Sequence, residues 1–120
     1  MYNYMTGNVY RDYMVSSKAH NSIIVDGNSY SVTAENSSKT GILKTTQTDE
    51  YDEILGFLDM YDGVSIDRHS YNFKGTIVLY DDIQSKEIHN YEQLFHLYPG
   101  IRILEQSNSE VSCIDECAWA

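Results

Sequence analysis

A histidine, His20, lies just ahead of the most strand-like run of the chain, Ile23-Ile24-Val25, in the stretch AHNSIIVDG. A neutral imidazole at this place could pack against a sheet, bind zinc or contact a substrate. The chain has 4 histidines, and no two of them form an HxH, HxxxH or HExxH spacing. A zinc site made from this sequence alone would therefore need ligands from distant positions, and all three roles of His20 stay open.

Two arginines have neighbours that could help them hold an acidic sugar. Arg11 lies between Tyr10 and Tyr13 in VYRDYM, and Arg68 precedes His69 in DRHSY. A guanidinium can bind a carboxylate through two parallel hydrogen bonds, and a tyrosine ring packs while its hydroxyl hydrogen-bonds. The alternatives are that the Arg11 stem packs on the two rings and that Arg68 and His69 lie on a solvated strand face.

The other candidates for chemistry are weak. Cys113 and Cys117 have a C-x3-C spacing instead of the C-x2-C of zinc knuckles and redox motifs, and no second pair completes a four-sulfur site. We therefore expect free thiols. The sequence has no glycine-rich phosphate loop, no GxSxG and no convincing Ser/His/Asp set. The residues alone predict no catalytic group.

The net charge of the chain limits the classes of partner that it could bind. Lys and Arg number 8 against 18 Asp and Glu, which gives a formal net charge of −10. Nucleic acids and anionic membrane surfaces require a basic face, so neither is an expected partner. An anionic polysaccharide would need a local basic cluster. The sequence has no run of about 18 apolar residues, so we expect no transmembrane helix. The first residues do not resemble a signal peptide, and the localisation stays open.

Short strand-like runs alternate with turn signals along the chain. We expect strands within 23–27, 28–32, 42–49, 64–73, 76–80, 91–98, 101–106 and 110–114. Residues 34–41 are typical of a loop, and 49–63 could form a short amphipathic helix that Gly56 weakens. The prediction is one all-β domain over residues 1–120, an antiparallel β-sandwich with room for one short helix. Within it, residues 1–19 form a leading segment and residues 113–120 a disordered tail.

The first part of the chain resembles the start of the β-sandwich in heparinase II/III-like polysaccharide lyases. The shared pattern runs from a Tyr-x-Tyr through an Arg-x-Tyr and a Ser-rich step to Ala-His-Asn-Ser, a hydrophobic triplet and Asp-Gly. The corresponding residues are Tyr2, Tyr4, Arg11, Tyr13, Ser16, Ser17, Ala19-His20-Asn21-Ser22, Ile23 to Val25 and Asp26-Gly27. DRHSYNFKGTIVLYDDI and YEQLFHLYPG are similar to two later segments of the family, in the same order.

The resemblance implies a β-sandwich that follows an α/α toroid in a lyase for uronic-acid polysaccharides. Such enzymes act by β-elimination, in which a base removes the proton next to the carboxyl group and an acid assists the leaving oxygen. The resemblance also implies zinc in the full-length family member, with His20 as one of its ligands. The candidate substrate-binding residues are then Tyr10, Arg11, Tyr13, Asn21, Arg68 and His69.

The family's catalytic groups come mostly from the toroid and from an HxH segment, and neither maps onto this sequence. We therefore expect a module that is catalytically incomplete and holds no zinc by itself, with an acidic polysaccharide and the toroid as partners. A stand-alone carbohydrate-binding or protein-interaction sandwich and a purely structural domain are the alternatives. Exposed aromatic residues in a row would favour carbohydrate binding, and a bare apolar sheet face would favour the toroid. Bare sheet edges would favour pairing with a second copy.

Overall fold

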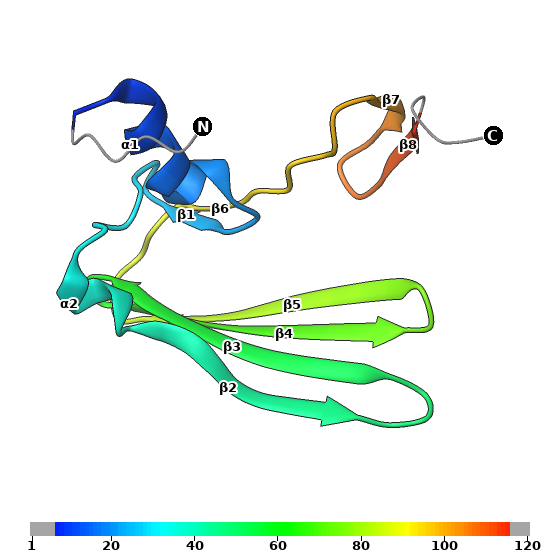
Figure 1. The fold of residues 1–120 in the computed structure, drawn as a ribbon, viewed down its shortest axis with the longest axis horizontal. Coiled ribbons are helices and arrows are strands. Elements are labelled where there is room, and N and C mark those ends of the chain that lie inside the picture. The colour runs from blue at the N-terminus through cyan, green and yellow to red at the C-terminus, as the bar shows by residue number, and fades with distance from the viewer. Residues whose placement is uncertain (1–6, 116–120) are drawn as a thin grey trace.

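The computed structural model describes residues 7–115 and has two layers of antiparallel strands (Figure 1). Its elements are α1 (Val9–Val15), the 3₁₀ helix η1 (Ser17–Ala19), β1 (Ile23–Val25), α2 (Ala34–Ser37), β2 (Thr40–Gln47), β3 (Asp52–Tyr61), β4 (Val64–Phe73), β5 (Thr76–Ser85), β6 (Tyr91–Gln93), β7 (Ile101–Gln106) and β8 (Val111–Asp115). One layer is a four-stranded sheet in the order β2-β3-β4-β5, and the other holds the pairs β1-β6 and β7-β8. This arrangement confirms the predicted all-β antiparallel sandwich.

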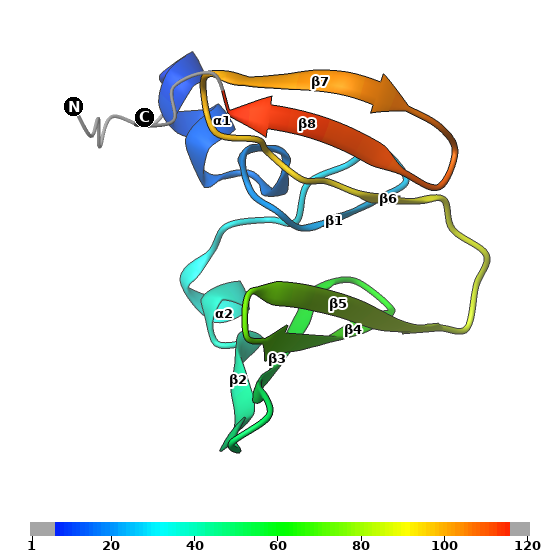
Figure 2. The same ribbon diagram turned by 90° about the vertical axis from the view of Figure 1, so that its right-hand side faces the viewer.

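The two layers are seen from another side in Figure 2, where α1 lies with β1, β6, β7 and β8 above the four-stranded sheet. The long strands β3, β4 and β5 are joined by tight turns at Asp62-Gly63 and Lys74-Gly75. Gly63 and Gly75 both have positive φ, 70° and 103°, a conformation that glycine adopts without steric cost. No helix among residues 7–115 is long and apolar enough to cross a membrane.

Most of the predicted strands are confirmed, and three local expectations were wrong. Residues 28–32 form no strand, because β1 pairs with the distant β6 and the turn after it makes only an isolated Val25–Asn28 bridge. Residues 34–41 are not a single loop. The Thr33 side chain accepts a hydrogen bond from the Asn36 backbone N–H and caps α2. The helix considered for 49–63 does not form either, since this segment contributes β3 to the centre of the sheet.

The hydrophobic core lies between β1 and the β3–β4 turn region of the four-stranded sheet. It consists of the buried residues Ile23, Val25, Val64 and Ile66, with Leu58, Tyr61 and Ile83 packed against them. The Tyr61 hydroxyl donates to the Ile23 carbonyl oxygen at 2.8 Å and lies 3.0 Å from Oγ of the fully buried Ser17. Burial raises the pKa of Tyr61. This tyrosine therefore joins the two layers through both packing and hydrogen bonds.

Away from this core, the inner face of the four-stranded sheet is bare. The strand register places Ile54, Ser70 and Leu79 in one row on the face that Ile66 and Arg68 share. Ile54 and Ile77, which is further along the same face, are 46% and 69% exposed. The second layer thus covers only part of the sheet, and an apolar area is left for another surface to cover.

Candidate functional site

The first helix presents three of the residues that the sequence analysis selected, Tyr10, Arg11 and Tyr13. None of the seven residues of α1 is buried, and Tyr10 and Tyr13 are 83% and 50% exposed. The helix begins at Asn8, whose side-chain oxygen accepts from the backbone N–H groups of Tyr10 and Arg11. It ends where Ser16 Oγ donates to the Tyr13 carbonyl oxygen at 2.6 Å. Together with Lys18 and His20, these residues form what we call the α1 surface, defined as Tyr10, Arg11, Tyr13, Lys18 and His20.

Arg11 has an incomplete set of hydrogen bonds. Its Nε atom is buried and finds no acceptor within residues 7–115, and its nearest carboxylate, that of Asp12, lies 4.0 Å from Nη1. Buried polar atoms in folded proteins nearly always have a partner, so an orphaned guanidinium donor calls for one. A carboxylate or sulfate group is the ligand that a guanidinium binds most strongly.

His20 has the hydrogen bond that a metal-binding histidine usually makes. Its Nε2 atom lies 3.0 Å from the carbonyl oxygen of Met14. A carbonyl oxygen only accepts, so Nε2 carries the hydrogen and the lone pair of a neutral ring is on Nδ1. Residues 7–115 contain no group of three or more His, Cys, Asp or Glu side chains that could hold a metal ion. His20 therefore fits one ligand position of a zinc site, and the described residues do not complete that site.

Arg68 and Asn21 are close together, and both hold the two layers in place. Arg68 Nε and Nη2 donate to the two carboxylate oxygens of Asp81 at 2.6 and 2.8 Å, and Nη1 donates to the Asn21 carbonyl oxygen at 2.6 Å. The hydrogen bonds to Asp81 raise the pKa of Arg68. Gln93 Nε2 donates to Asp81 at 2.5 Å, and Asn21 Oδ1 accepts from the His96 backbone N–H at 2.7 Å. This network, which we call the Arg68 link, uses all three nitrogens of the guanidinium.

His69 lies on the opposite face of the sheet from Arg68, because consecutive strand residues point to opposite sides. Its ring is 6.4 Å from that of Tyr71, with the planes 7° apart, and 5.7 Å from that of Tyr80. Tyr71 also stacks with Phe73 at 6.0 Å, and Tyr51 contacts both. We call these five residues the outer aromatic face. The structure therefore separates Arg68 from His69, and the clamp that the sequence analysis considered for this pair does not form.

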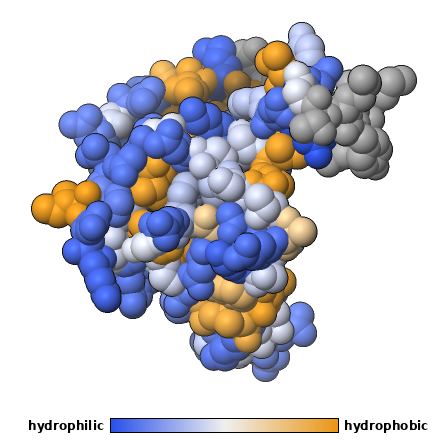
Figure 3. Space-filling model, turned by 90° about the vertical axis from the view of Figure 1, so that its left-hand side faces the viewer, coloured by the Kyte–Doolittle hydropathy of each residue, from blue (hydrophilic) through white to orange (hydrophobic). Residues whose placement is uncertain are grey.

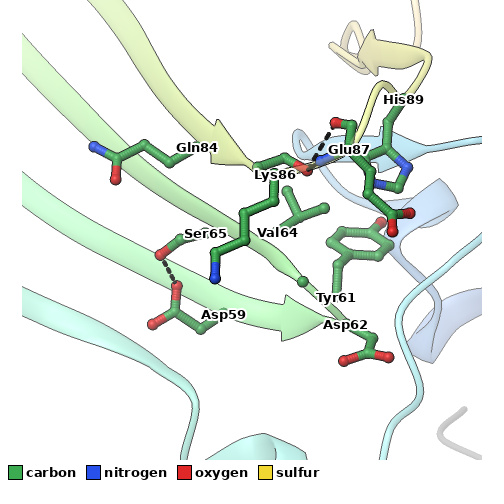
Figure 4. Close-up of a pocket in the computed structure, with 11 residues that line it drawn as sticks. Asp59, Tyr61, Asp62, Val64, Ser65, Gln84, Lys86, Glu87 and His89 are labelled. Atoms are coloured by element: carbon green, nitrogen blue, oxygen red, sulfur yellow. Dashed lines mark hydrogen bonds between the residues drawn. The ribbon is translucent and has the colours of Figure 1, made fainter.

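A cleft of about 780 Å³ lies beside the β3–β4 turn, and none of the site residues selected from the sequence lines it (Figure 4). Its lining includes three carboxylates, those of Asp59, Asp62 and Glu87, against one lysine, Lys86. Figure 4 shows Lys86 extended towards Asp59. An acidic lining repels an anionic ligand, so this cleft is a poor site for an acidic polysaccharide.

The same cleft contains a histidine that the sequence analysis did not select. His89 Nδ1 lies 2.7 Å from Asp26 Oδ2, and Asp26 Oδ1 accepts from the Asn90 backbone N–H at 2.8 Å. The hydrogen bond from His89, followed by that from Asn90, lowers the pKa of Asp26. The sequence feature that could have pointed to Asp26 is the Asp26-Gly27 turn, where Asp26 has a φ of 52°. Aspartate is one of the few residues that adopt this left-handed conformation readily.

The cysteine pair is described only in part. Cys113 is an exposed free thiol on β8, opposite Ile103 of β7. Cys117 and the rest of the predicted tail after residue 115 lie outside the described residues, as do Tyr2 and Tyr4 of the leading segment.

Comparison with known proteins supports the resemblance noted in the sequence. The family model for the heparinase II/III-like C-terminal domain matches residues 1–117, almost the whole chain. This chain belongs to that family, and it matches the domain that the family has at its C-terminal end. No curated protein and no solved structure matches the chain significantly.

Proposed function

We propose that this chain is the β-sandwich module of a heparinase II/III-type polysaccharide lyase and that its α1 surface contacts the acidic polysaccharide. The observation that carries the proposal is Arg11, whose Nε has no acceptor within residues 7–115 and whose neighbours in the sequence, Tyr10 and Tyr13, are exposed. The guanidinium would bind the acidic group of a sugar, and Tyr10 and Tyr13 would pack on sugar rings.

The local charge around α1 supports an anionic ligand. Residues 7–22 contain two basic residues, Arg11 and Lys18, and one acidic residue, Asp12, in a chain of net charge −10. An acidic polysaccharide is repelled by the field of the whole chain and would be attracted at this segment. The α1 surface is therefore the local basic cluster that such a ligand requires.

The chemistry in this proposal belongs to the complete enzyme. By resemblance, an α/α toroid supplies the base and the acid of the β-elimination, and this module forms the opposite wall of the substrate cleft. Zinc bound in the complete enzyme would have His20 as one ligand and would fix this end of the sandwich. The chain's own residues would bind and orient the polysaccharide.

Exposed apolar surface supports the toroid as a partner. The side chains of Val9 and Met14 on α1 are 79% and 57% exposed, and Ile54 and Ile77 leave the inner sheet face bare. Figure 3 views the end of the molecule where α1 and α2 lie and shows several hydrophobic patches between hydrophilic side chains. Surface of this kind is typical of a site that another domain covers.

One observation favours the alternative, a stand-alone carbohydrate-binding sandwich. The outer aromatic face places five rings side by side on β4, β5 and the turn before β3, and Phe73 and Tyr80 are 44% and 58% exposed. Aromatic side chains in a row can stack on sugar rings without any basic residue. In this alternative, Tyr71 and Tyr80 would bind sugar and Arg11 would not.

Titration calorimetry with a heparan sulfate oligosaccharide tests the proposal. We expect the wild-type chain to bind, and Arg11→Ala to lower the affinity about tenfold or more, because a charge-assisted hydrogen bond contributes about 1.5–3 kcal/mol. Lys39→Ala removes the same charge from an exposed site before β2 and should leave the affinity within about twofold. Loss of binding in Tyr71→Ala with full binding in Arg11→Ala would support the alternative and contradict the proposal.

An absorbance assay for unsaturated uronate products separates binding from catalysis. We expect no product from heparan sulfate, hyaluronan or alginate with this chain alone, with or without zinc, because no described residue is assigned as base or acid. New absorbance would show that the catalytic groups are in this chain and that their assignment to the toroid is wrong.

A further inference from the structure

The two edges of the four-stranded sheet differ in how they could pair with another strand. β2 and β5 are the edge strands. In β2 the register shifts between Ile42 and Lys44, and Lys44 lies in the middle of the strand. A bulge and a central lysine are two of the devices that keep an edge strand from pairing with another chain.

The β5 edge has neither of these devices. Its ten residues pair with β4 without a register shift, and it contains no lysine, arginine or proline. The run Thr76–Tyr80 is uncharged and β-prone, and Ile77, Val78 and Tyr80 are 69%, 45% and 58% exposed. Within residues 7–115, β5 pairs with β4 alone. A long, regular edge with an apolar run such as Thr76–Tyr80 is a template for another strand, although Asp81 and Asp82 follow that run.

We propose that a second copy of this chain pairs with β5 through its own β5, in antiparallel orientation, with Val78 opposite the partner's Val78. The two four-stranded sheets would join into one continuous sheet about a two-fold axis. The β5–β5 interface does not involve the α1 surface, so this proposal is independent of the proposed function.

The strand register selects this pairing. Residues that lie opposite each other in an antiparallel pair point to the same face of the sheet. A two-fold axis perpendicular to the sheet therefore allows only those registers in which the numbers of the two opposite residues add up to an even number. Centring on Val78 pairs Ile77 with the partner's Leu79 and Thr76 with the partner's Tyr80. Centring on Leu79 instead would place Ile77 opposite the carboxylate of Asp81, which the Arg68 link already holds.

Charge also favours the Val78 register. It brings Lys74, at the β4–β5 turn, beside Asp82 on β5 of the other copy, and the symmetry makes this contact twice. Asp82 lies directly opposite Asp67 in the β4–β5 ladder, and two like charges in that position repel each other. A lysine from the second copy would relieve this repulsion.

Sedimentation velocity on the wild-type chain and matched edge variants tests the proposal. We expect a dimer at concentrations on the order of tens of micromolar. Val78→Lys should give a monomer, because two lysines would face each other across the axis. Ile42→Lys adds the same charge to the β2 edge and should remain a dimer. A wild-type monomer, or equal effects of the two variants, would overturn the proposal.

A charge exchange tests the register. Lys74→Asp and Asp82→Lys should each weaken the dimer several-fold, and the double variant should restore it, because the exchanged charges at the two positions would again attract across the interface. Aspartate tolerates the positive φ of 50° at position 74, so the turn should persist. Circular dichroism of each variant would show whether the fold is retained. A dimer that is insensitive to all three changes contradicts this register and with it the proposed interface.

Discussion

Arg11 and Arg68 have the same side chain and opposite uses. Arg68 places its three nitrogens on Asp81 and on the Asn21 carbonyl oxygen, and so connects β4, β5 and the start of β1. Arg11 lies on a helix that buries none of its residues, and its Nε has no acceptor within residues 7–115. The difference shows that Arg68 acts within the fold, and it supports the proposal that Arg11 binds a ligand.

The same contrast holds for the two regions around these arginines. The Arg68 link and the core beside it contain paired or buried groups, such as Asp81, which is 6% exposed, and Tyr61. Within residues 7–115, the α1 surface has two exposed tyrosine rings, and the hydrogen bonds of Tyr13 and His20 go to nearby backbone carbonyl oxygens. Substitutions in the first region should therefore change stability, and substitutions in the second should change binding.

The largest effect on stability is expected from Arg68→Ala. It would leave the Asp81 carboxylate nearly buried without its guanidinium, which costs about 3–5 kcal/mol of unfolding free energy. Urea unfolding followed by circular dichroism measures this. The double variant Arg68→Met/Asp81→Leu should recover a large part of the loss, because no charge is then buried. A loss below about 1 kcal/mol in Arg68→Ala would show that the link does not hold the layers together.

Two tyrosines give the next comparison. Tyr61→Phe removes a hydroxyl that donates to the Ile23 carbonyl oxygen and should destabilise the chain by about 1–2 kcal/mol. Tyr13→Phe removes a hydroxyl that lies 3.4 Å from the Lys18 carbonyl oxygen at the surface and should stay within about 0.5 kcal/mol. The midpoints of their urea curves test this, and equal losses would contradict the division into two regions.

Arg11→Ala should have a very small effect on stability, within about 0.5 kcal/mol of the wild type. A slight gain would fit as well, because the substitution removes a buried donor that has no acceptor among residues 7–115. Its thermal midpoint should match that of the wild type. A clear loss of stability would mean that Arg11 packs as part of the fold, which was the alternative interpretation of its sequence context.

The Asp26–His89 pair should produce a small pH dependence. The pKa of Asp26 is lowered from its ordinary value of 3.8, so the carboxylate contributes stability above that pH, and the contribution is lost as the pH falls through the folded-state pKa. The stability difference between wild type and Asp26→Asn should therefore be greatest above the ordinary pKa of 3.8 and shrink as the pH falls below it. Asparagine suits the left-handed φ at this position, so the turn should be unaffected. A difference that grows as the pH falls would contradict the assignment.

Local parts of this account could be predicted from the sequence, because they depend on neighbours in the chain. Tyr10, Arg11, Tyr13 and His20 lie within eleven consecutive residues, so almost any fold keeps them close. The helix α1, which carries the first three of them, was not predicted. Its residues VYRDYMV are rich in β-prone side chains, and the Asn8 cap that starts it is a weak signal by itself.

The Arg68 link could not be predicted, because it requires strand pairing and long-range contacts. Asp81 reaches Arg68 only through the β4–β5 register, and Asn21 and Gln93 come from the other layer. By contrast, the separation of Arg68 from His69 follows from the two-residue period of a strand. A clamp built from both residues was therefore inconsistent with the strand that the sequence itself predicted for 64–73.

The most direct test of the central claim is an NMR titration of the ¹⁵N-labelled chain with a heparan sulfate oligosaccharide. The account predicts that amide shifts change mainly within residues 8–22, around α1 and His20, and that Arg11→Ala removes these changes. Shifts confined to the outer aromatic face on β4 and β5, or no shifts at saturating oligosaccharide, would contradict the claim that the α1 surface binds the polysaccharide.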